Sequence, residues 1–300
     1  MTQTRARIDR IEALIHEDVG RNAKALFAAS QGGLWRAAAA LASDGTPRIG
    51  LLTGFYVPDG DPPAAETDGP VGTALLAAGL TRAGVACRVL TDVPCASGCA
   101  AALHGAGVGF LPLDVMTLGS ASDATITAWR TADITWAIAI ERCGRSADGT
   151  MRNMRGRDIG AHAQPLDDVF SAGPWRTIGV GDGGNEIGMG ALPPGLVAAE
   201  ITYGARIACV TQADHLVMAG VSHWAAWGLI AALALLRTDW RTELMRCLDP
   251  ALDRMVLEAM VAHGPAVDGV SLRRSATIDS LDLATHHRKL AEIVAVVGAS

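Results

Sequence analysis

The run at 179–190, GVGDGGNEIGMG, holds the densest group of residues in this chain that could do chemistry. Its glycines allow backbone N–H groups to approach a bound ligand, because they carry no Cβ atom. Its carboxylates, Asp182 and Glu186, could bind a metal ion or move a proton. We therefore predict that both acids are catalytic, although a glycine-rich turn without a ligand is an open alternative. The residues of this run expected to bind substrate are Gly183, Gly184 and Asn185.

A second pair of acids, Glu66 and Asp68, precedes Pro70, a residue type that favours the first turn of a helix. In an extended chain, side chains two residues apart point to the same side, so both carboxylates can enter one site. We predict catalytic roles for both acids. The alternative is a capped helix start whose acids are solvated.

Arginines gather directly after a third acid, Glu141. Between residues 142 and 157 the sequence contains five arginines and, as its one acid, Asp148. Guanidinium groups bind carboxylates through two parallel hydrogen bonds, so we expect Arg142 or Arg155 to hold a substrate carboxylate. A solvated basic loop is the alternative.

These residues need a scaffold that brings their segments together. Short apolar runs alternate with helical patterns, as expected for a sheet that is covered on both faces. The six predicted strands are 48–53, 85–91, 108–113, 134–140, 176–180 and 205–210. We therefore predict an α/β fold with a largely parallel wound sheet of about six strands flanked by helices. The predicted division is a helical N-terminal extension at 1–44 and an α/β domain at 45–300.

The predicted sheet places the acids at one edge. Ligands of open α/β sheets bind outside the carboxyl ends of the strands, and Glu141 and Asp182 each follow a predicted strand closely. Hard divalent cations prefer oxygen ligands. The predicted ligands of one Mg²⁺ or Mn²⁺ ion are Glu141, Asp182 and Glu186, and Glu141 is also predicted to be catalytic.

An apolar stretch at 216–236 is long enough to span a bilayer, but it contains Ser222 and His223. We predict a buried helix rather than a membrane span, with His223 in the core. His215 stands at the start of this stretch, where we expect it to bind substrate and shuttle protons.

Composition disfavours several classes of partner. The net charge of −6 argues against a nucleic-acid-binding protein, which usually has a basic face. The glycine pattern does not match the dinucleotide fingerprint and no GxxxxGK[ST] motif occurs, so no nucleotide cofactor is expected. Six scattered cysteines and the lack of a recognisable targeting segment predict a protein of the reducing cytoplasm. A homo-oligomer is left open.

Several motifs together resemble the D-glutamate cyclase family, which includes the C-terminal domain of the mitochondrial enzyme and free-standing bacterial proteins. The motifs that carry the resemblance are Thr53-Gly54-Phe55, Glu66-Thr67-Asp68-Gly69-Pro70, Glu141-Arg142, Gly144-Arg145, Asn153-Met154-Arg155-Gly156, the run 181–190 and Ala213-Asp214-His215. They extend through nearly the whole chain after the first predicted helix. Two residues depart from the family pattern: Cys143 stands in place of proline and His223 in place of asparagine.

The resemblance implies a hydro-lyase that cyclises D-glutamate to 5-oxo-D-proline with loss of water. A divalent cation or an arginine on the substrate carboxylate would lower the barrier to attack by the amine, and a protein carboxylate would move the protons. Thr53 and Gly54, at the end of the first predicted strand, join the expected substrate-binding residues. Two alternatives stay open: a metal-dependent hydrolase or dehydratase of another small carboxylate or lactam, and a non-catalytic amino-acid-binding protein.

Overall fold

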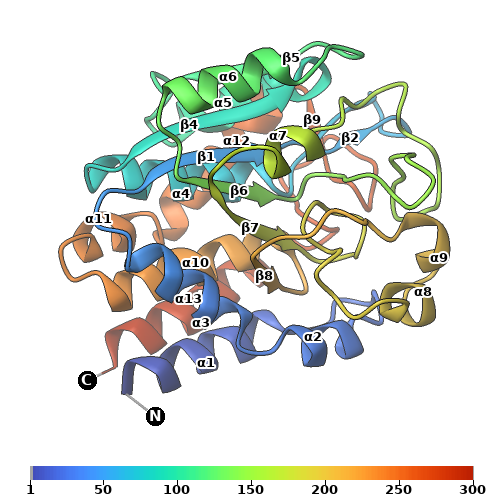
Figure 1. The fold of residues 1–300 in the computed structure, drawn as a ribbon. Helices are drawn as coiled ribbons and strands as arrows, with labels where there is room; N and C mark the ends of the chain where they lie inside the picture. The colour runs from blue at the N-terminus through green and yellow to red at the C-terminus, as the bar shows by residue number, and fades with distance from the viewer. Residues whose placement is uncertain (1–2, 300) are drawn as a thin grey trace.

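A six-stranded, all-parallel sheet forms the centre of the computed structural model, which describes residues 3–299 (Figure 1). The strands lie in the order β5-β4-β1-β6-β7-β8. Their bounds are β1 Arg48–Thr53, β4 Ala86–Asp92, β5 Leu113–Met116, β6 Trp136–Ile140, β7 Arg176–Gly181 and β8 His215–Met218. The predicted α/β class and the largely parallel sheet are confirmed.

Helices cover both faces of this sheet. They are α1 Gln3–Ile15, α2 Lys24–Ser30, α3 Gly33–Ala42, α4 Pro70–Arg82, α5 Val93–Gly105, α6 Asp123–Thr131, α7 Asp167–Ser171, α8 Leu196–Glu200, α9 Gly204–Ile207, α10 Ser222–Leu236, α11 Arg241–Arg246, α12 Pro250–His263 and α13 Leu283–Gly298. Alternate residues of a strand point to opposite faces. Ile138 and Ile140 of β6 join the larger core, which includes α1, α3, α4, α5, α10, α12 and α13. Ala137 and Ala139 join the smaller core under α6 and α7.

Helix α10 runs through the middle of the larger core. Nearly all of its residues are buried, because it packs against α1, α3, α4, α11 and α13. A helix enclosed on all sides has no polar face, which explains why its sequence resembles a membrane span. No helix that the structure describes is long and apolar enough to cross a membrane.

A small second sheet lies beside the carboxyl edge of the main sheet. Its strands are β2 Tyr56–Val57, β3 Ala64–Glu66 and β9 Ala266–Val267, in the order β2-β3-β9. Strand β3 pairs antiparallel with β2 and parallel with β9. This pairing brings Glu66 next to the C-terminal part of the chain.

Two predicted strands differ from the structure. The strand expected at 108–113 forms at Leu113–Met116, and the segment 205–210 begins with the short helix α9 instead of forming a strand. The sixth strand is β8, inside the stretch that was expected to be helical. Hydrophobic runs alone do not separate a buried strand from a buried helix. The carboxylate of Asp214 accepts hydrogen bonds from the N–H and the hydroxyl of Thr177, which sets the following residues beside β7.

The N-terminal helices belong to the larger core. Ile8, Ile11 and Ile15 of α1 are fully buried, α1 packs against α10 and α13, and α3 packs against α10 and β8. Figure 1 shows α1, α3 and α13 along the same side of the molecule. The division into an extension at 1–44 and a domain at 45–300 stays a prediction. The loop between α1 and α2 reaches the pocket described next.

Candidate active site

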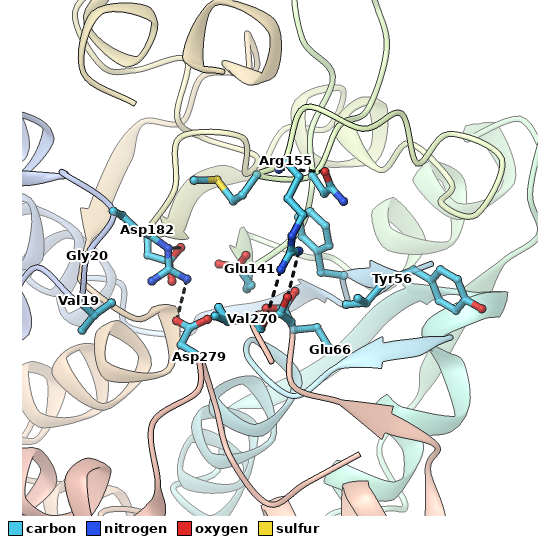
Figure 2. Close-up of a pocket in the computed structure, with 15 residues that line it drawn as sticks. Val19, Gly20, Tyr56, Glu66, Glu141, Arg155, Asp182, Val270 and Asp279 are labelled. Carbon is cyan, nitrogen blue, oxygen red and sulfur yellow. Dashed lines mark hydrogen bonds and ion pairs between the residues drawn. The ribbon is translucent and has the colours of Figure 1, made fainter. Parts of the chain in front are cut away.

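A pocket of about 290 Å³ opens at the carboxyl edge of the sheet (Figure 2). This volume is just below the roughly 300–1,000 Å³ usual for sites of drug-sized ligands, so the pocket suits a small molecule. Four acids and two arginines give its lining an excess of negative charge. These charged residues are Arg21, Glu66, Glu141, Arg155, Asp182 and Asp279.

Three buried carboxylates meet at this edge. Asp68 precedes α4, Glu141 follows β6 and Asp182 follows β7. One oxygen of each lies within 4.8 Å of the other two. The exposed fractions of the three residues are 1%, 6% and 1%. Three carboxylate oxygens at this separation fit a hard divalent cation such as Mg²⁺ or Mn²⁺.

The N-terminus of α10 holds these three acids in place. The N–H of Ser222 lies 3.1 Å from Asp68 Oδ2 and 3.1 Å from Asp182 Oδ2 and donates to both. The N–H of His223 donates to Asp68 Oδ1 at 2.8 Å. The Ser222 hydroxyl donates to Glu141 Oε2 at 2.5 Å. Free N–H groups and the helix dipole both stabilise negative charge at this end of a helix.

Burial and crowding raise the pKa values of the three acids. Burial raises the pKa of Asp68 to about 7. Burial, followed by the charges of Asp182 and Glu186, raises the pKa of Glu141 well above its usual range. Burial also raises the pKa of Asp182 well above its usual range, although the charge of Arg21 opposes the increase. A divalent cation would favour the ionised forms, so the acids fit such a cation by charge as well as by ligand type.

Glu186 shapes the loop that carries Asp182. Its Oε1 accepts the N–H groups of Asp182 and Gly183 at 3.0 and 2.7 Å, and its Oε2 accepts that of Gly184 at 2.7 Å. Glycine suits two of these positions. Gly184 has a φ of +98°, and a Cβ on Gly183 would lie 2.5 Å from the Met154 sulfur. Both oxygens of Glu186 accept backbone N–H groups, and this acid lies outside the group of candidate metal ligands among the described residues.

Glu66 differs from the other acids because it has no partner. It ends β3, lines the pocket and is 8% exposed. Its carboxylate makes no hydrogen bond and no ion pair within residues 3–299. Burial, followed by the charges of Asp279 and Asp68, raises the pKa of Glu66 well above its usual range. A buried carboxyl group of this kind, facing a pocket, is suited to move protons.

Arg21 and Asp279 reach the pocket from opposite ends of the chain. Arg21 Nη2 lies 2.8 Å from Asp279 Oδ2, and Arg21 Nε lies 3.3 Å from Asp182 Oδ1. The sequence pattern identifies neither Arg21 nor Asp279, because a single arginine after a glycine and a single aspartate in a C-terminal loop are common and unremarkable. Packing of both chain ends against the sheet edge brings the two residues together.

Comparison with known proteins agrees with the resemblance seen in the motifs. A family model described as D-glutamate cyclase-like, C-terminal, matches residues 11–294. The chain belongs to this family. Human mitochondrial D-glutamate cyclase is 34% identical over 200 residues, which are 62% of this chain and 32% of the human protein. The matched part therefore spans about a third of the length of this relative.

In this D-glutamate cyclase-like chain, Arg155 closes one side of the pocket. Its Nη1 and Nη2 donate to the carbonyl oxygens of Gly269 and Val270 at 3.3 and 3.1 Å. The guanidinium is exposed and can exchange these carbonyls for a ligand carboxylate. The predicted contact of Arg155 with a substrate carboxylate stays a prediction.

Arg142 lies in a different environment, although it directly follows Glu141. It is 1% exposed, and its guanidinium donates to Asp92 Oδ2 and to the Gly54 carbonyl, both at 2.6 Å. It also donates to the Gln164 carbonyl. Arg142 links buried loops, and the structure does not bring it into the pocket lining.

Other predicted substrate-binding residues lie behind the pocket lining. Thr53 Oγ1 donates to the Ile140 carbonyl at 2.9 Å, and the Gly54 carbonyl is the acceptor of an arginine, as described above. Asn185 Nδ2 donates to the Arg152 carbonyl at 2.8 Å. These residues support the backbone around the pocket, as do the two glycines that bond to Glu186.

His215 lies far from the pocket. It begins β8, so it is at the amino edge of the sheet, whereas the acids follow the carboxyl ends of β6 and β7. There its ring stacks on Trp136 with 6.2 Å between ring centroids. The structure does not bring His215 to the candidate site, because this residue starts a strand instead of a helix.

The two departures from the family pattern are both buried. Cys143 is 1% exposed, and burial raises the pKa of its thiol well above the usual range, so the thiol stays neutral. His223 Nε2 lies 2.7 Å from Asp253 Oδ1. The predicted core position of His223 is confirmed, and it contacts Asp68 through its backbone N–H.

Proposed function

We propose that this member of the D-glutamate cyclase-like family is a hydro-lyase that converts D-glutamate to 5-oxo-D-proline, with a divalent cation held by Asp68, Glu141 and Asp182. The observation that carries the proposal is the convergence of these three buried acids beside a small pocket that also contains two arginines and the unpartnered Glu66. Family membership and the name of the human relative favour this reaction among those that the site permits.

The reaction joins the substrate amine to its own γ-carboxylate. A C–N bond forms, one C–O bond breaks, and the departing oxygen leaves as water after receiving two protons from the ammonium nitrogen. An unactivated carboxylate resists attack because it is negatively charged. A divalent cation bound by the three acids supplies positive charge that lowers this barrier.

The residues of the chain supply binding and proton transfer. Arg155 binds a substrate carboxylate through its two Nη groups. Glu66 accepts a proton from the amine and returns it to the departing oxygen, which its raised pKa favours. A pocket of about 290 Å³ holds the substrate in a ring-like conformation, so the amine and the carboxyl carbon meet at reduced entropic cost.

Turnover of D-glutamate by metal-free protein, before and after addition of Mn²⁺ or Mg²⁺ and without ATP, tests the proposal. We expect 5-oxo-D-proline to form only with added cation, and L-glutamate to react more slowly. Unchanged turnover after thorough chelation would reject the role of the cation. No product from either enantiomer, with Mn²⁺ bound, would reject the cyclase.

A panel of other small carboxylates and lactams separates the remaining alternatives. Turnover of one of these compounds in place of D-glutamate would indicate a hydrolase or dehydratase that uses the same site. Binding of D-glutamate without turnover of any compound would indicate an amino-acid-binding protein.

A further inference from the structure

Asp279 is a buried acid in the pocket lining that has few partners. It is 6% exposed, and its carboxylate points into the pocket (Figure 2). Its Oδ2 forms the ion pair with Arg21 at 2.8 Å, whereas its buried Oδ1 has no hydrogen-bond partner within residues 3–299. Buried polar atoms in proteins are nearly always hydrogen-bonded. The unpartnered Oδ1 of Asp279 therefore indicates a ligand with N–H or O–H donors.

The position of Asp279 is set by contacts around it. Its φ is +54°, a backbone conformation that is uncommon outside glycine, asparagine and aspartate. The next residue, Ser280, donates its N–H to Asp268 Oδ2 at 2.7 Å. Ile278 and Leu281 pair across the turn. The surrounding backbone thus presents the Asp279 carboxylate to the pocket.

Contacts with the backbone also fix the position of Arg21, the partner of Asp279. The carboxylate of Asp18 accepts the N–H groups of Gly20 and Arg21 at 3.1 and 2.9 Å and forms a tight turn. Arg21 Nη1 donates to the Gly220 carbonyl at 2.9 Å. Arg21 is therefore held by backbone contacts and orients Asp279 from one side, which leaves the other side of that carboxylate facing the pocket.

Glu66 provides a second carboxylate on the same pocket. The charges of Glu66 and Asp279 interact: after burial, the charge of Asp279 contributes most to raising the pKa of Glu66. Figure 2 shows both carboxylates directed into the pocket. Neither belongs to the group of Asp68, Glu141 and Asp182, which among the described residues is the one that could hold a metal ion.

An ammonium group fits these two acids by charge and by hydrogen bonding. It carries one positive charge and three N–H donors and needs no further ligands, whereas a divalent cation takes about six oxygen ligands. We propose that Asp279, beside Glu66, binds the ammonium group of an amino-acid substrate and makes the pocket select amines over the corresponding deaminated acids. The inference rests on the proposed function, since it places the substrate amine of that reaction in this pocket.

With the ammonium group at Asp279, each charged residue of the pocket has a different role. Asp279 receives the ammonium group, and Glu66 lies next to the nitrogen whose protons must be removed. Arg21 positions Asp279 and does not need to contact substrate. Asp68, Glu141 and Asp182 would hold the divalent cation, whose positive charge would make the substrate's γ-carboxylate easier to attack.

Binding of matched pairs of ligands to the D279N variant tests the inference. The pairs are D-glutamate with glutarate and D-aspartate with succinate, measured by titration calorimetry in the presence of Mn²⁺. Asparagine tolerates the positive φ of this position, so the variant is expected to fold. We expect D279N to bind the amine-bearing acid roughly 10- to 100-fold more weakly, the range for losing a hydrogen bond to a charged group, and to bind the deaminated acid unchanged.

The D168N variant is the matched control, because Asp168 also pairs with an arginine, Arg145, but is 51% exposed and lies outside the pocket lining. It should leave every affinity unchanged. Equal weakening of both members of a pair by D279N, or no amine preference in the wild-type protein for any pair, would overturn the inference. An amine preference that D279N abolishes, without turnover of D-glutamate, would support the inference and reject only the cyclase.

Discussion

Glu141 and Arg142 are neighbours in the sequence, yet they show two different ways of burying charge. The guanidinium of Arg142 bonds to the Asp92 carboxylate and to two carbonyls, so its charge is neutralised within the protein. Glu141 is also buried, but it lies beside the carboxylates of Asp68 and Asp182. Its charge is left for a ligand to neutralise.

The different surroundings of Arg142 and Glu141 show how a structural buried charge can be distinguished from a functional one in this fold. Glu141 follows the end of β6 with a φ of +44°, and there the chain directs Glu141 to the pocket and Arg142 into packed loops. A buried charge that is paired with an opposite charge, as Arg142 is with Asp92, holds the loops together. A group of like charges with raised pKa values costs stability and marks a binding or catalytic site.

Breaking the buried Arg142–Asp92 ion pair should have the largest effect on stability. The Arg142→Met variant leaves Asp92 buried without its cation, which should lower the free energy of unfolding by about 3–5 kcal/mol. Urea denaturation measures this change. The exposed Arg145–Asp168 pair offers the control, and Asp168→Asn should cost less than about 1 kcal/mol. Weaker substrate binding by Arg142→Met at unchanged stability would instead make Arg142 the carboxylate clamp that its sequence position suggested.

Removing one charge from the group of Asp68, Glu141 and Asp182 should leave the fold intact and reduce turnover. Glu141→Gln keeps the shape of the side chain and an acceptor for the Ser222 hydroxyl. Its turnover should fall roughly 10²-fold or more, with weaker Mn²⁺ binding. The melting temperature of the metal-free variant should stay the same or rise, because repulsion in the cluster decreases. Full activity, or a large loss of stability, would contradict the functional interpretation of the cluster.

Glu186→Gln compares an acid that bonds to the backbone with Glu141, a candidate metal ligand. This variant removes a charged acceptor of three backbone N–H groups, so it should cost about 1–3 kcal/mol of stability. Its effect on Mn²⁺ affinity should be smaller than that of Glu141→Gln. The reverse order of the two affinities would restore Glu186 as a metal ligand.

The last effect concerns how the stability of the metal-free protein depends on pH. Folding raises the pKa of Asp68 to about 7, from about 3.9 in an unfolded chain. Between these values the folded state holds a proton that the unfolded state has lost, so the free energy of unfolding should fall as pH rises from about 4 to about 7. Thermal melts across this range should show the decrease, and Asp68→Asn should reduce it. A decrease of equal size in Asp68→Asn would assign the effect to other groups.

Much of the fold was predictable because it depends on local patterns. Apolar runs that alternate with helical periodicity predicted the parallel sheet, and the burial of Ile138 and Ile140 in one core and Ala137 and Ala139 in the other follows from strand geometry. The misplaced strand at 205–210 shows the limit. There the segment packs as the short helix α9 against α8, while β8 took its place in the sheet.

The candidate site was predictable in part for the same reason. Acids that follow strands collect at the carboxyl edge of any parallel sheet, so Glu141 and Asp182 could be assigned there from the sequence. Glu186 is close to Asp182 in sequence, but its carboxylate bonds to the backbone of its own loop and lies outside the acid group, which a residue pattern does not reveal. The role of Arg142 depended on Asp92, a partner fifty residues away.

The sequence by itself determined the α/β class, the family and the edge of the sheet at which the acids gather, because these follow from periodicity and from motifs of adjacent residues. Only the tertiary structure decided which of two adjacent side chains faces the pocket, and it alone brought Arg21 and Asp279 together from the two ends of the chain. The physical reason is that side-chain direction and partnership depend on contacts between distant segments. Such contacts exist only after both chain ends have packed against the sheet.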